Sequence, residues 1–240
     1  MKKLKTILVS AFLVLTLSSI AQQRIQGMWK VSGRDPSGTD YSGNLKIDTI
    51  NQKWYRLIWE IKYPGKKGVT EFRGTGFYDP NSVELITAYG ATNPRYGLFE
   101  YELNEKGGLF GTGNWTSQLG RGAELIGGKL NKSMVEGTYE VVGRRSQGDV
   151  EIGASETYKG TLRITKEGEM YHVIWELGES EPFEGFGYVI NDKLVGVWGM
   201  GKAFGMKIYS LDGEQNSGVS DDWTSPFYSF KAGQETIEKQ

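Results

Sequence analysis

Apolar and polar residues alternate along most of this chain, as they do in β-strands that bury one face. In residues 45–48, leucine and isoleucine alternate with lysine and aspartate, and residues 162–165 and 171–176 show the same two-residue period. Apart from residues 7–17, long segments with the 3.6-residue apolar period of a helix are missing. The pattern predicts an all-β protein.

Turn-forming residues interrupt this alternation at short intervals. They include Asp35-Pro36-Ser37-Gly38, Tyr63-Pro64-Gly65, Asp79-Pro80-Asn81, Asn191-Asp192 and Asp212-Gly213. Short strands separated by such turns are typical of an antiparallel meander. Glycine is abundant, with 34 residues in 240, and Gly74, Gly76, Gly185 and Gly187 lie inside strand-like sequence. These four glycines predict bulges or coiling that let a small barrel bend.

The chain repeats its own pattern about 110 residues later. Residues 27–34 (GMWKVSGR) return as residues 137–144 (GTYEVVGR), and residues 55–60 (YRLIWE) return as residues 171–176 (YHVIWE). Each copy offers about eight strands, the number that closes a small barrel. We therefore predict two tandem antiparallel up-and-down β-barrels, one in residues 22–131 and one in residues 132–240.

The first residues have the features of a signal peptide. Lys2, Lys3 and Lys5 precede an apolar run over residues 7–17, and Ser19-Ile20-Ala21 places small residues at the two positions that signal peptidase reads. The run is shorter than the roughly 20 residues that span a bilayer. We expect cleavage after Ala21, export to the periplasm or beyond, and no transmembrane segment in the mature protein.

Composition and charge exclude several kinds of site. The chain has 28 basic and 29 acidic residues without a basic cluster, so we expect no nucleic-acid partner. It has no cysteine and a single histidine, which excludes disulfides, thiolate metal sites and two-histidine metal sites. No catalytic motif is present. We therefore assign no catalytic residues, metal ligands or cofactor.

The Gly-x-Trp motif at Gly27-Met28-Trp29, followed by the up-and-down pattern, resembles the calycin group of lipocalins, fatty-acid-binding proteins and avidin-like barrels. The second copy departs from it, because Tyr139 stands where Trp29 stands in the first. The chain is also similar in pattern to tandem secreted bacterial repeats, sometimes labelled as fibronectin-binding proteins. This resemblance implies a binding or scaffolding role, with an enzyme as the less common case.

Aromatic residues at repeated strand positions are the first candidates for a ligand site. They are Trp29, Tyr55, Trp59, Tyr89 and Trp115 in one copy and Tyr139, Tyr171, Trp175, Trp198 and Trp223 in the other. Such rings suit a flat, apolar or sugar ligand if they line a cavity, and otherwise they form the core of each barrel.

Charged residues at repeated positions are the second set of candidates. Arg34 with Glu60, and Arg144 with Glu176, could form a polar anchor on neighbouring strands, or simply solvated cross-strand pairs. His172 replaces Arg56 of the first copy, and its alternative interpretation is a partly exposed strand histidine. Residues 198–205 differ from residues 89–97, which predicts unlike loops at the two barrel mouths.

These observations favour an exported, non-enzymatic binding protein for a small apolar, aromatic or sugar ligand, including a glycan. One alternative is a cofactor-independent isomerase- or cyclase-like enzyme that uses a barrel cavity. Another is a surface adhesion or interaction module with an extracellular protein partner, which would need a wide exposed aromatic patch.

Overall fold

The computed structural model describes residues 25–50, 54–91, 95–117, 120–128, 133–146, 156–178 and 181–240. Within these ranges the chain forms sixteen strands and one short 3₁₀ helix, η1 (Pro226–Tyr228). The strands are β1 (Gly27–Arg34), β2 (Asp40–Thr49), β3 (Trp54–Lys62), β4 (Thr70–Asp79), β5 (Glu84–Ala91), β6 (Tyr96–Leu103), β7 (Leu109–Ser117), β8 (Gly120–Gly127), β9 (Gly137–Ser146), β10 (Glu156–Glu167), β11 (Met170–Glu176), β12 (Phe183–Ile190), β13 (Lys193–Gly199), β14 (Phe204–Leu211), β15 (Ser217–Trp223) and β16 (Gly233–Lys239).

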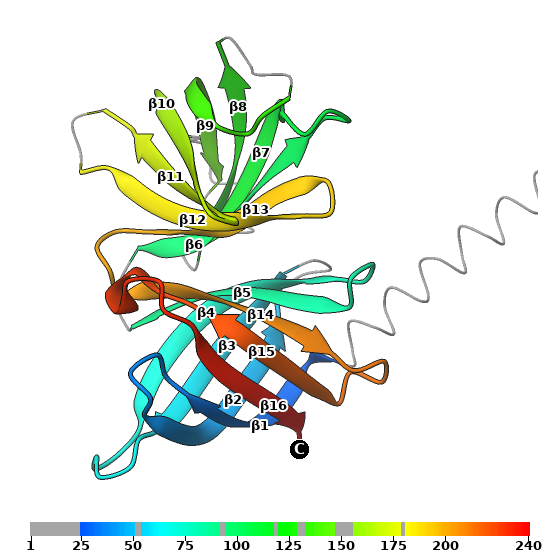
Figure 1. The fold of residues 1–240 in the computed structure, drawn as a ribbon, viewed down its shortest axis with the longest axis vertical. Helices are drawn as coiled ribbons and strands as arrows, with labels where there is room; N and C mark the ends of the chain where they lie inside the picture. The colour runs from blue at the N-terminus through cyan, green and yellow to red at the C-terminus, as the bar shows by residue number, and fades with distance from the viewer. Residues whose placement is uncertain are drawn as a thin grey trace, which may run out of the picture.

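The strands close into two antiparallel barrels of eight strands each (Figure 1). One barrel has the strand order β1-β16-β15-β14-β5-β4-β3-β2, and we call it the terminal barrel because it holds the first and the last strand. The other has the order β10-β11-β12-β13-β6-β7-β8-β9, and we call it the inserted barrel. The prediction of an all-β protein with two closed eight-stranded antiparallel barrels is confirmed.

The predicted boundary near residue 131 does not separate the two barrels. The inserted barrel consists of the consecutive strands β6 to β13, and it interrupts the terminal barrel between β5 and β14. The repeats are nevertheless where the sequence places them, since β1 to β8 belong to the first copy and β9 to β16 to the second. Each barrel therefore takes five strands from one repeat and the last three strands from the other.

This exchange follows from the equivalence of the two copies. In each barrel the fifth strand of one repeat pairs with the sixth strand of the other repeat. In the terminal barrel β5 pairs with β14, with Ala88 opposite Met206, and in the inserted barrel β13 pairs with β6, with Val197 opposite Leu98. The chain crosses between barrels after β5 and again after β13. The segment 198–205, predicted as a mouth loop, is thus the end of β13, the second crossover and the start of β14.

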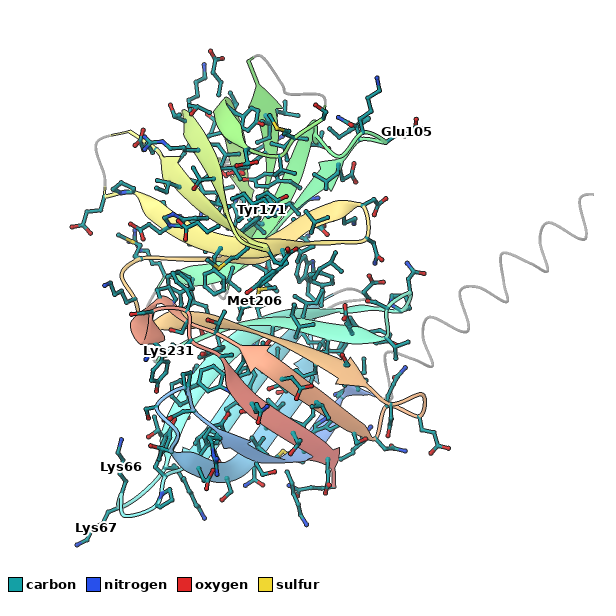
Figure 2. The ribbon with its side chains drawn as sticks, in the orientation of Figure 1. Lys66, Lys67, Glu105, Tyr171, Met206 and Lys231 are labelled. Atoms are coloured by element: carbon teal, nitrogen blue, oxygen red, sulfur yellow. The ribbon has the colours of Figure 1, made fainter. Side chains whose placement is uncertain are left out.

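The strands on either side of the crossovers are buried on both faces. Their inner side chains fill the barrels. Their outer side chains, together with Phe77 of β4 and Phe186 of β12, form a separate apolar cluster between the barrels, where Figure 2 shows Met206. The buried members of this cluster are Phe77, Ile86, Ala88, Tyr96, Leu98, Phe186, Val195, Val197, Phe204 and Met206. Apolar burial of this kind holds the two barrels together.

The bulges predicted at the strand glycines do not form at Gly74 and Gly76. Pairing continues without a register shift through Gly74 and Gly76 on both sides of β4, so these residues form no bulge. A Cβ atom at Gly74 would lie 2.6 Å from the Trp59 ring, closer than side chains can approach. The glycine thus makes room for an aromatic ring inside the barrel. Register shifts occur elsewhere, between Ser220 and Trp223 of β15 and near the end of β6.

The predicted signal peptide, residues 1–21, lies outside the described residues. Among the residues that are described, no helix is long and apolar enough to cross a membrane.

Candidate functional site

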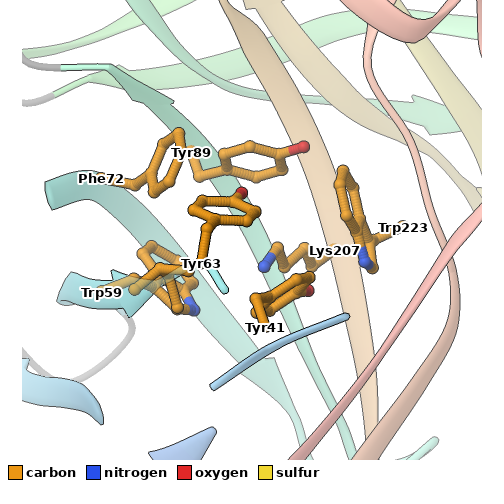
Figure 3. Close-up of a pocket in the computed structure, with 8 residues that line it drawn as sticks. Tyr41, Trp59, Tyr63, Phe72, Tyr89, Lys207 and Trp223 are labelled. Carbon is orange, nitrogen blue, oxygen red and sulfur yellow. The ribbon is translucent and has the colours of Figure 1, made fainter. Parts of the chain in front are cut away.

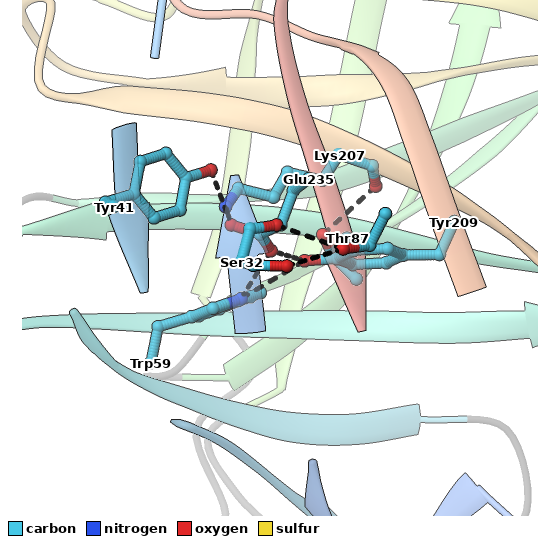
Figure 4. Close-up of polar contacts among 8 residues, drawn as sticks. Ser32, Tyr41, Trp59, Thr87, Lys207, Tyr209 and Glu235 are labelled. Carbon is cyan, nitrogen blue, oxygen red and sulfur yellow. Dashed lines mark hydrogen bonds and ion pairs between the residues drawn. The ribbon is translucent and has the colours of Figure 1, made fainter. Parts of the chain in front are cut away.

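A buried carboxylate lies at the centre of the terminal barrel. Glu235 on β16 is only 1% exposed. It accepts hydrogen bonds from the Tyr41 hydroxyl at 2.7 Å, from Trp59 Nε1 at 3.3 Å and from the Tyr209 hydroxyl (Figure 4). Lys207 Nζ lies 2.5 Å from Glu235 Oε2 and forms a buried ion pair with it. Donors from β2, β3 and β14 thus converge on one carboxylate of β16.

Burial controls the protonation of these groups. Loss of hydration lowers the pKa of Lys207, and the adjacent Glu235 carboxylate opposes that change by favouring the charged ammonium. For Tyr41 and Tyr209, burial and the Glu235 charge raise the pKa well above the usual value for tyrosine. Both hydroxyls are therefore held neutral as hydrogen-bond donors.

An aromatic pocket opens beside this cluster (Figure 3). It is lined by Tyr41, Trp59, Ile61, Tyr63, Phe72, Tyr89, Lys207 and Trp223. The volume open to the centre of a water molecule is about 20 Å³, which is enough for one water or a group of similar size. The lining comes from both repeats, because β2 to β5 belong to the first copy and β14 and β15 to the second.

Aromatic rings surround the Lys207 ammonium in this pocket. Its Nζ atom lies 5.0 Å from a ring centroid of Trp223, 5.1 Å from that of Tyr89 and 5.3 Å from that of Trp59. The Tyr41 ring is slightly farther, at 5.9 Å. Ring faces at such distances attract a cation, and the attraction strengthens where water is excluded. The ammonium is thus stabilised by Glu235 and by the rings together.

Two other pocket residues hold buried polar atoms without a partner. The Tyr89 hydroxyl and Trp223 Nε1 make no hydrogen bond to any described residue. Buried polar groups are normally paired, and an unpaired one costs free energy. Lys207 adds to this surplus of donors, since an ammonium has three N–H groups and the hydrogen bond found here uses one, to Glu235.

The inserted barrel contains a closely matching cluster. Glu124 on β8 is buried and accepts hydrogen bonds from the Tyr158 hydroxyl at 2.6 Å, from Trp175 Nε1 at 3.4 Å and from the Tyr101 hydroxyl. Trp115 Nε1 donates to the Tyr158 hydroxyl at 2.7 Å. The carboxylate, the two tyrosines and the two tryptophans therefore occur at equivalent strand positions in both barrels.

The two clusters differ at one decisive position. Phe99 on β6 occupies the place that Lys207 occupies on β14, and its ring centroid lies 5.1 Å from that of Trp175. Among the described residues, the hydrogen bonds of Glu124 therefore come from tyrosines and a tryptophan and not from a lysine, and burial raises its pKa. The inserted barrel thus keeps the carboxylate and fills the position of the ammonium with a phenyl ring.

Six of the ten predicted aromatic candidates lie in the pocket or at the equivalent positions of the inserted barrel, and four lie elsewhere. Trp59, Tyr89 and Trp223 line the pocket, and their counterparts in the inserted barrel are Trp175, Trp198 and Trp115. The other four are placed as follows: Trp29 donates to the Ile25 carbonyl at 3.0 Å, Tyr139 donates to the Val135 carbonyl at 2.9 Å, Tyr55 is a core residue, and Tyr171 is half-buried beside Lys166.

The predicted Arg/Glu anchors are not formed. Arg34 on β1 and Glu60 on β3 are separated by β2, just as Arg144 on β9 and Glu176 on β11 are separated by β10, and all four side chains are exposed. The ion pairs that do form are local ones: Arg34 with Asp40 at 2.6 Å, and Glu176 with Arg163 at 2.9 Å. His172 is half-buried, 3.9 Å from Glu184.

Sequence reasoning missed the residues at the centre of the site. Glu124 and Glu235 stand in a repeated Gly-x-Glu-x-Ile pattern, at residues 122–126 and 233–237, which could have marked them. Lys207 could have been found as the polar exception in a strand whose counterpart has Phe99 at that position. Among the residues described, no group of three or more acidic or histidine side chains is placed to hold a metal ion.

Comparison with known proteins finds no protein-family model that matches this chain and no significantly similar curated sequence.

Proposed function

We propose that this chain is an exported binding protein whose terminal barrel holds a small ligand in the aromatic pocket. The observation that carries the proposal is the Lys207 ammonium among four aromatic rings at the edge of a cavity. The inserted barrel shows that the fold can complete the same cluster with Phe99 instead. The lysine is therefore not a requirement of the barrel, and its buried charge calls for another reason.

The electrostatics favour binding over proton transfer. An isomerase- or cyclase-like enzyme would need groups that exchange protons near neutral pH. Tyr41 and Tyr209 are held neutral by their raised pKa, and Lys207 is tied to Glu235 at 2.5 Å. Hydrogen-bond donors in fixed positions beside aromatic side chains are suited to binding a ligand without converting it.

Lys207→Phe tests this proposal because it places in the terminal barrel the phenylalanine that the inserted barrel has at the equivalent position, Phe99. We would screen metabolites and glycans by tryptophan fluorescence against the native chain, Lys207→Phe, Trp59→Phe and Trp175→Phe. We expect a ligand whose signal is lost in Lys207→Phe and reduced in Trp59→Phe, but is kept in Trp175→Phe. Loss in Trp175→Phe alone would move the site to the inserted barrel. No signal with any compound would refute a pocket ligand and leave the outer surface, where Phe110 and Leu125 are each 63% exposed.

The proposed export has its own test. The intact mass of the protein recovered from outside the cytoplasm should correspond to a chain that begins at Gln22. An uncleaved chain that stays in the cytoplasm would refute export without affecting the pocket.

A further inference from the structure

We infer that the ligand of the terminal barrel is a small neutral compound that inserts a carbonyl oxygen into the pocket. This inference rests on the proposed function and narrows it to a chemical class. The evidence is the hydrogen-bonding capacity that the pocket leaves unused, its charge and its size.

The unused capacity consists of donors. The Tyr89 hydroxyl and Trp223 Nε1 are buried without a partner, and the one hydrogen bond found for the Lys207 ammonium goes to Glu235. Figure 3 shows the Tyr89 hydroxyl directed towards the Trp223 side of the pocket. The Tyr41 hydroxyl already donates to Glu235. A carbonyl oxygen would accept from these donors and add no donor of its own, whereas a hydroxyl would add another donor and an ammonium accepts no hydrogen bond.

The charge of the pocket favours a neutral ligand. Lys207 and Glu235 neutralise each other at 2.5 Å, so the pair has no net formal charge. A carboxylate ligand would lose its hydration and would be repelled by Glu235, which lies next to the ammonium. A cationic ligand would be repelled by the ammonium itself. A carbonyl oxygen accepts hydrogen bonds without introducing either charge.

The size of the pocket determines how much of the ligand enters. A volume of about 20 Å³ accommodates one oxygen-sized group, not a whole ring. The carbonyl group would therefore occupy the cavity, while the rest of the ligand lies against Tyr63 and Phe72, the two lining residues that are only half-buried. Aromatic lining there favours a flat, apolar body.

Matched aromatic probes test this class. We would titrate benzamide, benzoate and benzylamine into the ¹⁵N-labelled chain and follow the indole N–H signal of Trp223, assigned with Trp223→Phe. We expect benzamide to shift this signal and to bind about tenfold tighter than the two charged probes. Tighter binding of benzoate or benzylamine would overturn the inference and leave a pocket ligand of another class.

Tyr89→Phe separates ligand binding from structure. It removes only a hydroxyl that has no partner, so the thermal unfolding midpoint should stay the same or rise. Benzamide binding should weaken about three- to tenfold, because one hydrogen bond is lost. Unchanged benzamide affinity would overturn the role of Tyr89 as a donor. If no probe binds and the metabolite screen is also empty, the proposed function fails too; if the screen yields a ligand without a carbonyl group, only this inference fails.

Discussion

The terminal and inserted barrels each contain a buried carboxylate cluster of the same composition, but the residue beside the carboxylate differs between them. Each has a carboxylate that accepts hydrogen bonds from two tyrosines and a tryptophan, at Glu235 and at Glu124. In the terminal barrel Lys207 adds a charge, and in the inserted barrel Phe99 adds apolar contact. The comparison shows that the carboxylate cluster belongs to the scaffold, while the residue beside it distinguishes one barrel from the other.

The neighbouring tryptophans show the consequence of that difference. In the inserted barrel, Trp115 Nε1 donates to the Tyr158 hydroxyl at 2.7 Å. Its counterpart in the terminal barrel, Trp223 Nε1, is buried without a partner among the described residues. The Lys207 ammonium lies 5.0 Å from the Trp223 ring and 5.9 Å from the Tyr41 ring. The inserted barrel therefore pairs this indole internally, and the terminal barrel leaves it unpaired. Trp198 Nε1, the counterpart of the Tyr89 hydroxyl in the inserted barrel, is likewise buried without a partner among the described residues, so the barrels differ at the first tryptophan and not at this second position.

Glu235→Gln should give the largest loss of unfolding free energy among the substitutions that test this comparison. It leaves the Lys207 ammonium buried without its counter-ion, which costs about 3–5 kcal/mol of unfolding free energy. Glu124→Gln is the matched control and should cost less, about 1–3 kcal/mol, because no lysine depends on that carboxylate. Urea unfolding followed by tryptophan fluorescence gives both values. Equal losses would show that Lys207 does not distinguish the barrels energetically.

A cysteine pair tests which strands complete each barrel. Ser32 Oγ and Thr236 Oγ1 lie 2.8 Å apart across β1 and β16, and the native chain has no cysteine. Ser32→Cys with Thr236→Cys should therefore form a disulfide that stabilises the protein by about 2–4 kcal/mol. Mass spectrometry after mild oxidation of dilute protein detects it.

The control pair is Ser32→Cys with Leu125→Cys, because Leu125 on β8 is the counterpart of Thr236 in the first repeat. These two positions are in different barrels, so the pair should remain reduced. A disulfide in the control pair, with none in the test pair, would mean that each repeat closes its own barrel.

The pH dependence of the inserted barrel should give a smaller effect. Glu124 faces Tyr101, Tyr158 and Trp175, and burial raises its pKa above the ordinary value of 4.5. Because the pKa of Glu124 is higher in the folded state than in the unfolded state, its contribution to stability is fully present below the pKa of the unfolded state. This contribution is lost as the pH rises through the pKa of the folded state. We expect the difference in unfolding free energy between the native chain and Glu124→Gln to shrink as pH rises above 4.5. A difference that grows over that range would contradict the raised pKa.

Much of the fold could be predicted because strand signals are local. The alternation over residues 45–48 and 171–176 and the turn residues between strands depend only on near neighbours, and the structure places strands there. The site was harder to predict. Trp59 and Trp175 were identified from their repetition, but Glu235 and Lys207 gain their meaning only from contacts across the barrel, which no local pattern reveals.

The sequence by itself determined the strands, the two-barrel count and the equivalence of the two copies. Only the tertiary structure decided that β14 to β16 close the barrel of β1 to β5. Because β6 and β14 are equivalent strands, they have the same alternation of apolar and polar residues and the same hydrogen-bonding edges. Local sequence therefore does not decide whether β5 pairs with β6 or with β14. The choice depends on contacts between segments far apart in the chain. Those contacts include the apolar cluster between the barrels, and they place Lys207 of one repeat against Tyr41, Trp59 and Tyr89 of the other.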